Sequence, residues 1–226
     1  MIARASASLA VIGLVSLGAG TASAQTGTSA SGRFEIAGGV QWIGGLDLGS
    51  RDATLTTSTG DRYTPFSTSS EIDKAVGANV RVGFRLTRVI QLEAAASYVT
   101  PMLRTSISGD QENGAPTIAS ESFRQFAVEG GAAIWLPCCE RSLVRPFASI
   151  GGGYVRELDE GGSLVETGRL FYAGGGVSVP FVTRAEGGRL KQAGVRIDAR
   201  AVVRSGGVTP GRHVVPSIGA SLFARF

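Results

Sequence analysis

Apolar residues alternate with polar or small residues over long stretches of this chain. The clearest case runs from Val76 to Leu86, where every even position is apolar and the odd positions from Gly77 to Arg85 are small or polar. A period of two places each set on one face of a β-strand, whereas helical spacing would scatter the same arginines around a cylinder. The pattern therefore predicts strands that have one apolar and one polar face.

Eight segments show this alternation. They cover residues 33–45, 75–86, 89–102, 122–136, 143–155, 167–181, 192–204 and 215–226. Glycine runs at 151–153 and 174–176 blur the pattern and are expected where strands bend or pack closely. Strands of this length exceed the usual five or six residues and suit the roughly 9 to 11 residues that cross a membrane at a tilt.

The N-terminus has the three parts of a secretory signal peptide. Arg4 supplies a positive charge, an apolar stretch follows from Leu9 to Gly20, and Ala22-Ser23-Ala24 forms an A-x-A cleavage site. The expected organisation is a signal peptide at 1–24, a flexible leader at 25–32 and one barrel domain at 33–226. Beyond the signal peptide, no stretch approaches the roughly 18 apolar residues of a membrane-spanning helix.

A secreted chain without a spanning helix can cross a membrane only as a closed barrel, because backbone groups in lipid must pair with one another. The connections support this: 46–74 and 103–121 are long, whereas the turn at Thr87 and Arg88 is short, as in outer-membrane barrels. The predicted fold is all-β, a closed antiparallel eight-stranded up-and-down transmembrane β-barrel in the cell outer membrane of a Gram-negative bacterium. A soluble β-sandwich would bury the same apolar residues, and composition alone does not exclude it.

The last ten residues, SIGASLFARF, place five apolar residues in phase: Ile218, Ala220, Leu222, Ala224 and Phe226. This ending resembles the C-terminal β-signal by which bacterial outer-membrane barrels are recognised for insertion. Residues 83–101 and 145–177 resemble the strand-turn-strand units of the OmpA-like/OmpW-like small barrel family. The resemblance covers Arg33 to Phe226 and implies a barrel, contact with outer-membrane lipid and lipopolysaccharide, and recognition by the barrel-assembly machinery. It implies no activity.

The polar face carries many charges that would lie inside the barrel. The predicted inward set is Arg33, Arg81, Arg85, Arg145, Arg196, Arg200, Arg204 and Arg225 against Glu35, Glu93, Glu129 and Asp198, a surplus of four positive charges. An eight-stranded barrel is just wide enough for its own side chains, so these charges are expected to pair as a polar plug. The alternative is a narrow, anion-preferring water path beside Gly77, Gly83, Gly131 and Gly219.

Residues that could carry chemistry are few. The single histidine, His213, lies four residues before Ser217, about 13 Å along a strand, which is too far for a serine hydroxyl to reach its base. No cofactor is expected. Acidic residues such as Glu157, Asp159 and Glu160 are predicted to form a solvated outer loop without a metal site.

Cys138 and Cys139 are adjacent in a turn of a protein in an oxidising compartment. They can close a strained disulfide, stay reduced or cross-link two chains, and a structural role is the favoured prediction. The sequence pI near 9.5 does not indicate nucleic-acid binding, because the arginines recur at period two along strands instead of forming an exposed patch.

The sequence thus predicts a non-enzymatic barrel with a structural or surface-interaction role, which maintains the envelope and offers loops 46–74 and 103–121 to exterior partners. A small channel for ions, water or small solutes is the second hypothesis. A lipid-modifying barrel enzyme that uses His213 is the third.

Overall fold

The computed structural model describes residues 32–109, 117–136, 143–159, 165–183, 189–207 and 211–226. Eight strands form the barrel: β1 (Phe34–Ile43), β6 (Ala75–Arg85), β7 (Ile90–Val99), β9 (Thr117–Trp135), β10 (Arg145–Asp159), β11 (Val165–Thr183), β12 (Gln192–Gly206) and β13 (Arg212–Arg225). Among the described residues, no helix is long and apolar enough to span a bilayer. The predicted signal peptide, the leader up to residue 31, Cys138, Cys139 and Glu160 lie outside the described residues.

The barrel is closed and antiparallel. Each of its strands pairs with the next barrel strand in the chain, and β13 pairs with β1 to complete the ring. At this seam the Phe226 amide donates to the Phe34 carbonyl at 2.8 Å, and the Phe34 amide donates to the Phe226 carbonyl at 3.3 Å. The predicted eight-stranded up-and-down fold is confirmed.

The alternation separates the two faces of the wall as predicted. Apolar side chains such as Val76, Val80 and Ile218 point outward and are exposed, whereas their neighbours along each strand are buried in the interior. The last strand follows the same rule, since Leu222 and Phe226 are also exposed. Outward-facing apolar groups of this kind are the surface that lipid covers in a membrane barrel.

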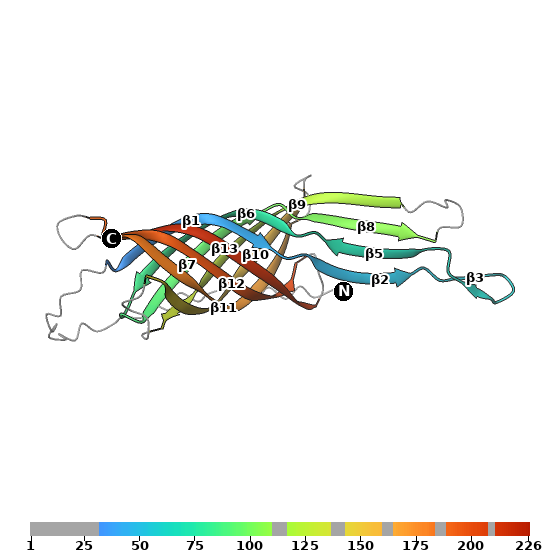
Figure 1. The fold of residues 1–226 in the computed structure, drawn as a ribbon. Coiled ribbons are helices and arrows are strands. Elements are labelled where there is room, and N and C mark those ends of the chain that lie inside the picture. The colour runs from blue at the N-terminus through green and yellow to red at the C-terminus, as the bar shows by residue number, and fades with distance from the viewer. Residues whose placement is uncertain (1–31, 110–116, 137–142, 160–164, 184–188, 208–210) are drawn as a thin grey trace, which may run out of the picture.

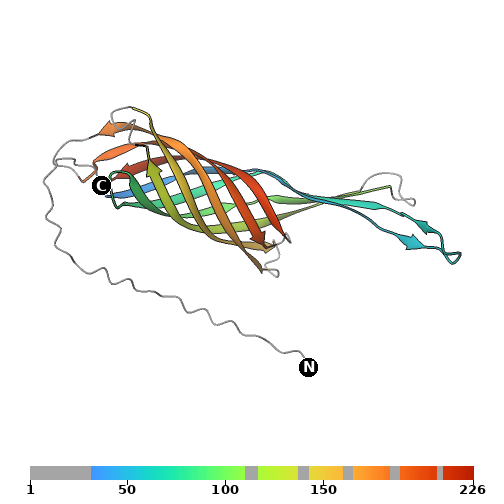
Figure 2. The same ribbon diagram turned by 90° about the horizontal axis from the view of Figure 1, so that it is seen from below.

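The predicted long loops are largely strands, which corrects the sequence-based prediction. Residues 46–74 and 103–121 contain β2 (Leu46–Asp52), β3 (Leu55–Thr56), β4 (Arg62–Tyr63), β5 (Ser67–Ile72), most of β8 (Met102–Ser108) and the start of β9. The strands β9, β8, β5 and β2 lie side by side in that order and continue the barrel wall outward as an arm, with the β3–β4 hairpin beyond it (Figures 1 and 2). Both faces of these strands meet solvent, so their sequences lack the apolar alternation that reveals a strand.

The opposite end of the barrel carries the C-terminus and the short turn between β6 and β7 (Figures 1 and 2). There the Thr87 hydroxyl accepts hydrogen bonds from the amides of Val89 and Ile90 at 3.2 and 2.9 Å. This side chain satisfies backbone donors that the turn would leave unpaired. The arm and the chain end therefore mark two different ends of the molecule.

Candidate functional site

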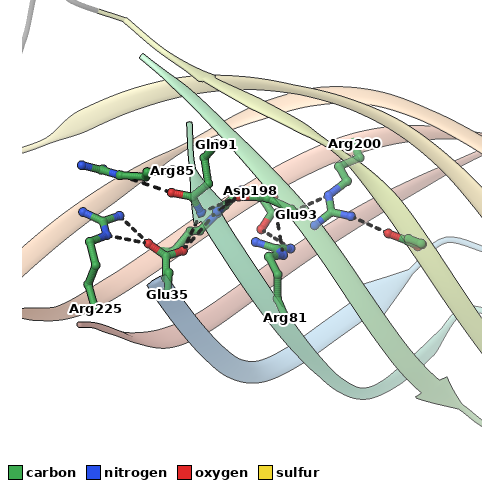
Figure 3. A network of polar contacts seen from close by, with 10 residues as sticks. Glu35, Arg81, Arg85, Gln91, Glu93, Asp198, Arg200 and Arg225 are labelled. Atoms are coloured by element: carbon green, nitrogen blue, oxygen red, sulfur yellow. Dashed lines mark hydrogen bonds and ion pairs between the residues drawn. The ribbon is translucent and has the colours of Figure 1, made fainter. Parts of the chain in front are cut away.

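The centre of the barrel interior is a network of buried ion pairs (Figure 3). Arg196 on β12 donates to both carboxylate oxygens of Glu93 on β7, with Nη1–Oε1 and Nη2–Oε2 distances of 2.5 and 3.0 Å. Arg81 on β6 lies 3.8 Å from Glu93 through Nε and 3.3 Å from Asp198 through Nη2. The two carboxylates therefore neutralise guanidinium groups from β6 and β12, which are not neighbours in the barrel.

The network continues toward both ends. On the arm side, Arg200 donates to Asp198 Oδ2 at 2.6 Å and to Glu129 Oε2 at 2.9 Å. On the short-turn side, Arg225 pairs with Glu35, and Gln91 donates to Glu35 Oε1 at 3.1 Å and to Glu93 Oε1 at 3.0 Å. Most of the predicted inward charges thus form one connected chain of contacts along the lumen.

Aromatic rings provide further partners for the cations. Arg196 lies 4.0 Å from the ring centre of Phe147, and Arg200 lies 4.8 Å from that of Tyr172. Arg85 and Arg225 lie 5.3 and 5.6 Å from the ring centre of Trp135. Cation–π contact is attractive within about 6 Å and strengthens when the pair is desolvated. Sequence reasoning missed these rings as partners, although each occupies an inward position in the alternation.

Two predicted charge positions need correction. Arg33 precedes β1 and is exposed, so it is not part of the interior. Glu157, predicted to lie in a solvated acidic loop, is buried on β10 and lines a cavity with Arg204 and Gln125. Strand β10 extends further than the sequence pattern indicated, and this extension carries Glu157 to an inward position. Both changes reduce the positive surplus inside the barrel.

The remaining predicted lumen residues, Arg85, Arg145 and Arg204, form fewer polar contacts. Arg204 donates to Gln125 Oε1 at 2.8 Å, and Arg85 donates to Gln91 Oε1 at 3.4 Å. Arg145 is half-buried at the start of β10. The Nε atoms of Arg145 and Arg204 are buried without a hydrogen-bond partner in the described part of the chain.

Inward glycines leave room that other side chains fill. A Cβ added to Gly131 would lie 2.5 Å from the Tyr172 hydroxyl, and one added to Gly151 would meet the same hydroxyl at 2.5 Å. A Cβ at Gly83 would lie 2.4 Å from the Gln91 amide nitrogen. The glycines proposed to flank a water path thus include positions where the neighbouring space holds protein atoms.

Apolar clusters occupy the arm end of the interior. One comprises Ile43, Ala75, Val99 and Val215, and the other comprises Ala127, Val155, Leu170, Tyr172 and Val202. A cavity of about 20 Å³ is lined by members of the first cluster and by Glu157 and Arg204. This volume accommodates about one water molecule.

The serine and the histidine of the candidate pair both lie on β13. Ser217 is buried on β13, and its hydroxyl accepts a hydrogen bond from Gln41 Nε2 at 2.9 Å. His213 lies further along the same strand, opposite Arg204 in the β12–β13 register. No group of three or more His, Cys, Asp or Glu side chains that could bind a metal ion occurs among the described residues.

Comparison with known proteins finds similar solved structures. No protein-family model matches the chain, and no curated protein matches its sequence. The outer membrane protein OprG from Pseudomonas aeruginosa is similar in structure, with a TM-score of 0.49 and 11% identity over 86% of this chain and 93% of that one. The β-domain of the Bordetella autotransporter BrkA gives a TM-score of 0.28 and 13% identity over 87% of this chain and 100% of that one. The strand registers and the apolar outer wall independently give this chain the architecture of a small outer-membrane β-barrel.

Proposed function

We propose that this protein is a closed, non-enzymatic outer-membrane barrel that displays a β-sheet arm to the exterior for contact with other molecules. The observation that carries the proposal is the arm, in which four strands extend the wall beyond the barrel at the end opposite the C-terminus (Figure 1). Outer-membrane barrels have short periplasmic turns and long extracellular connections, so the arm end faces outward.

The interior supports a structural role for the barrel itself. The ion-pair chain from Arg225 to Glu129 crosses the lumen, and the two apolar clusters fill its arm end. Buried charges paired in this way do not require water or a transported anion as partner. A barrel filled by its own side chains has the structural role of holding the arm in the membrane.

The β2 edge of the arm has features that disfavour non-specific strand pairing. A bulge separates Asp47 from Gly49 on the edge strand β2, Gly49 has a φ of +89°, and its amide donates to the Asp47 side chain at 2.8 Å. Bulges and charged residues on an edge strand disfavour edge-to-edge association. Contact through the faces or the tip of the arm is therefore favoured over contact through the β2 edge.

Labelling of intact cells tests the display of the arm. A cysteine introduced by Ser50→Cys on β2 should react with a membrane-impermeant maleimide, whereas one introduced by Arg88→Cys in the opposite turn should react only after the outer membrane is opened. The unsubstituted chain controls for Cys138 and Cys139. Labelling of Arg88→Cys in intact cells, with Ser50→Cys protected, would reverse the orientation and contradict the proposal.

A small channel is the second candidate, favoured by the buried Nε atoms of Arg145 and Arg204, for which the described residues provide no hydrogen-bond partner. Planar-bilayer recording of the refolded mature chain, residues 25–226, separates the two functions once a heat-modifiable gel shift shows that the barrel has formed. The closed barrel should give no stable conductance steps. Anion-preferring steps that weaken when Arg81 or Arg200 is replaced would establish the channel instead.

A further inference from the structure

The outward positions of the described barrel strands carry charge at only one end of the barrel. Among the described side chains of the eight barrel strands, the outward positions hold no carboxylate, and their charged residues are all arginines at the arm end. We call these exposed residues the arginine belt: Arg124 on β9, Arg156 on β10, Arg169 on β11 and Arg212 on β13. Such placement is unexpected at the midplane of a lipid-facing wall, where an arginine is strongly destabilising, whereas an arginine near the interface is tolerated.

The strand registers place the belt side chains next to one another. Arg124 lies opposite Leu158 and Arg156 opposite Phe126, so the two arginines are diagonal neighbours on adjacent strands, roughly 7–8 Å apart. Arg156 and Arg169 have the same diagonal relation on β10 and β11.

Arg169 and Arg212 both lie opposite Ser205 of β12, from its two sides, which separates them by two strand spacings, about 9–10 Å. The four guanidinium groups therefore form one continuous band over β9 to β13.

A row of exposed apolar side chains lies directly below the belt, on the short-turn side. It consists of Phe126, Tyr154, Phe171 and Val214, each two residues from a belt arginine on the same strand face. Aromatic girdles in membrane barrels mark the boundary between hydrocarbon and headgroups. The arginines one step further out consequently reach the headgroup layer.

The belt arginines have no acidic partner in the part of the chain that the structure describes. None of the four forms an ion pair with a described carboxylate, whereas Arg104, on the arm, lies 3.0 Å from Asp73 and 3.8 Å from Glu71. Arg104 is thus already neutralised by its neighbours. The positive charge of the belt is therefore not neutralised by any carboxylate among the described residues.

We infer that the arginine belt binds the phosphate groups of outer-leaflet glycolipid, lipopolysaccharide. Guanidinium groups donate two parallel hydrogen bonds to phosphate, and the apolar row beneath offers contact to the first part of the acyl chains. The inference rests on the proposed outward orientation of the arm end, because only that leaflet carries this glycolipid. Binding would hold the β9–β13 side of the barrel against the densely phosphorylated surface.

Equilibrium binding of the refolded mature chain in zwitterionic micelles tests this inference. The belt variant carries R124Q, R156Q, R169Q and R212Q. The matched control carries R33Q, R88Q, R189Q and K191Q, which removes the same charge from exposed or half-buried positions at the other end. The belt variant should bind lipopolysaccharide at least about tenfold more weakly, since one basic side chain near an anionic lipid surface contributes roughly fivefold. The control variant should bind as the unsubstituted chain does.

Further measurements test whether binding depends on the lipopolysaccharide phosphates and on the charge of the belt. Dephosphorylated lipopolysaccharide should bind the unsubstituted chain as weakly as the belt variant binds the intact glycolipid, and belt lysines should restore part of the affinity. Equal binding by the belt variant, an equal loss in the control, or equally strong competition by phosphatidylglycerol would overturn the inference. Heat-modifiability confirms that each variant is folded, and cysteine labelling of the arm reports the orientation separately. The inference about lipopolysaccharide binding can therefore be disproved without disproving the proposed function.

Discussion

At the scale of single residues, the charged interior depends on cancellation of charge in a small volume. Arg196 and Glu93 have side chains that are 1% and 5% exposed, so neither can exchange its partner for bulk water. Removing one member of a buried pair leaves an uncompensated charge, which costs more than the pair contributes when intact. Stability of the barrel should therefore respond far more to the interior carboxylates than to those of the arm.

Glu93→Gln should destabilise the barrel by about 3–5 kcal/mol, because Arg196 and Arg81 both lose a negative partner in a buried site. Urea unfolding in lipid vesicles measures the change. Glu71→Gln is the matched control, since Glu71 pairs with Arg104 at 3.8 Å on an arm where the two side chains are 52% and 45% exposed. Its cost should stay below about 1 kcal/mol. Equal losses in the two variants would contradict the view that the interior pairs hold the barrel together.

Glycine contributes to the same interior through its missing side chain. In Gly131→Ala the new Cβ would lie 2.4 Å from the Ile150 carbonyl oxygen and 2.5 Å from the Tyr172 hydroxyl, so strand or ring must move. We expect a loss of roughly 1–3 kcal/mol, as for other overpacked sites. Gly130→Ala, the adjacent outward position with nothing within 4 Å, should be neutral or slightly stabilising. The midpoint of the heat-modifiable gel shift compares the two variants, and an unaffected Gly131→Ala would show that the interior is loosely packed.

At the scale of elements, hydrogen bonds join the arm and the barrel into one sheet. The two parts differ in how they are stabilised, because the arm buries little apolar surface. The arm strands contribute Leu46 as a partly buried neighbour of the cluster around Ile43, whereas the other members of that cluster belong to barrel strands. Serine and threonine make up four of the six residues of β5 and three of the seven of β8, and the hydroxyls of the opposite residues Ser70 and Thr105 lie 3.2 Å apart. Cross-strand pairs of this kind stabilise a sheet without burying apolar area.

The barrel should fold without the arm. Leu46 and Ile72 are register partners, as are Leu103 and Glu121, so Asn-Gly turns can replace residues 47–71 and 104–120. The shortened chain should keep its heat-modifiable gel shift and its β-sheet circular dichroism, because the ion pairs and the apolar clusters of the barrel remain. Loss of the folded form would show that the arm is needed for barrel assembly and would remove the argument for it as a separate display element.

At the scale of the whole molecule, closure depends on the last strand, which pairs with β12 on one side and β1 on the other. If the ending serves as the insertion signal that it resembles, Phe226→Ala should lower the amount of protein in the outer membrane severalfold while the purified chain still refolds in vitro. Phe181→Ala, another exposed aromatic on the outward face near a strand end, should leave the amount unchanged. Equal defects in cells and in refolding would instead assign Phe226 a role in stability.

The alternation in the sequence determined which face of each strand is apolar, and with it the barrel wall and most of the inward charges. Period two is a local property, so it was readable without knowledge of any partner strand. The same reasoning failed for the arm, where both faces are wet, and for Glu157, where β10 extends past the segment that alternates clearly. It placed Arg33 inside because the pattern does not show where the wall of the barrel begins.

Only the tertiary structure decided which groups meet. Arg196 and Glu93 are 103 residues apart, and Arg225 and Glu35 are 190 apart, so their contact follows from ring closure and register. The aromatic rings over the arginines and the grouping of Arg124, Arg156, Arg169 and Arg212 into one band have the same origin. A strand pattern specifies the direction of a side chain, whereas its neighbours depend on how far each strand slides past the next, and that sliding is fixed by the packing of the whole barrel.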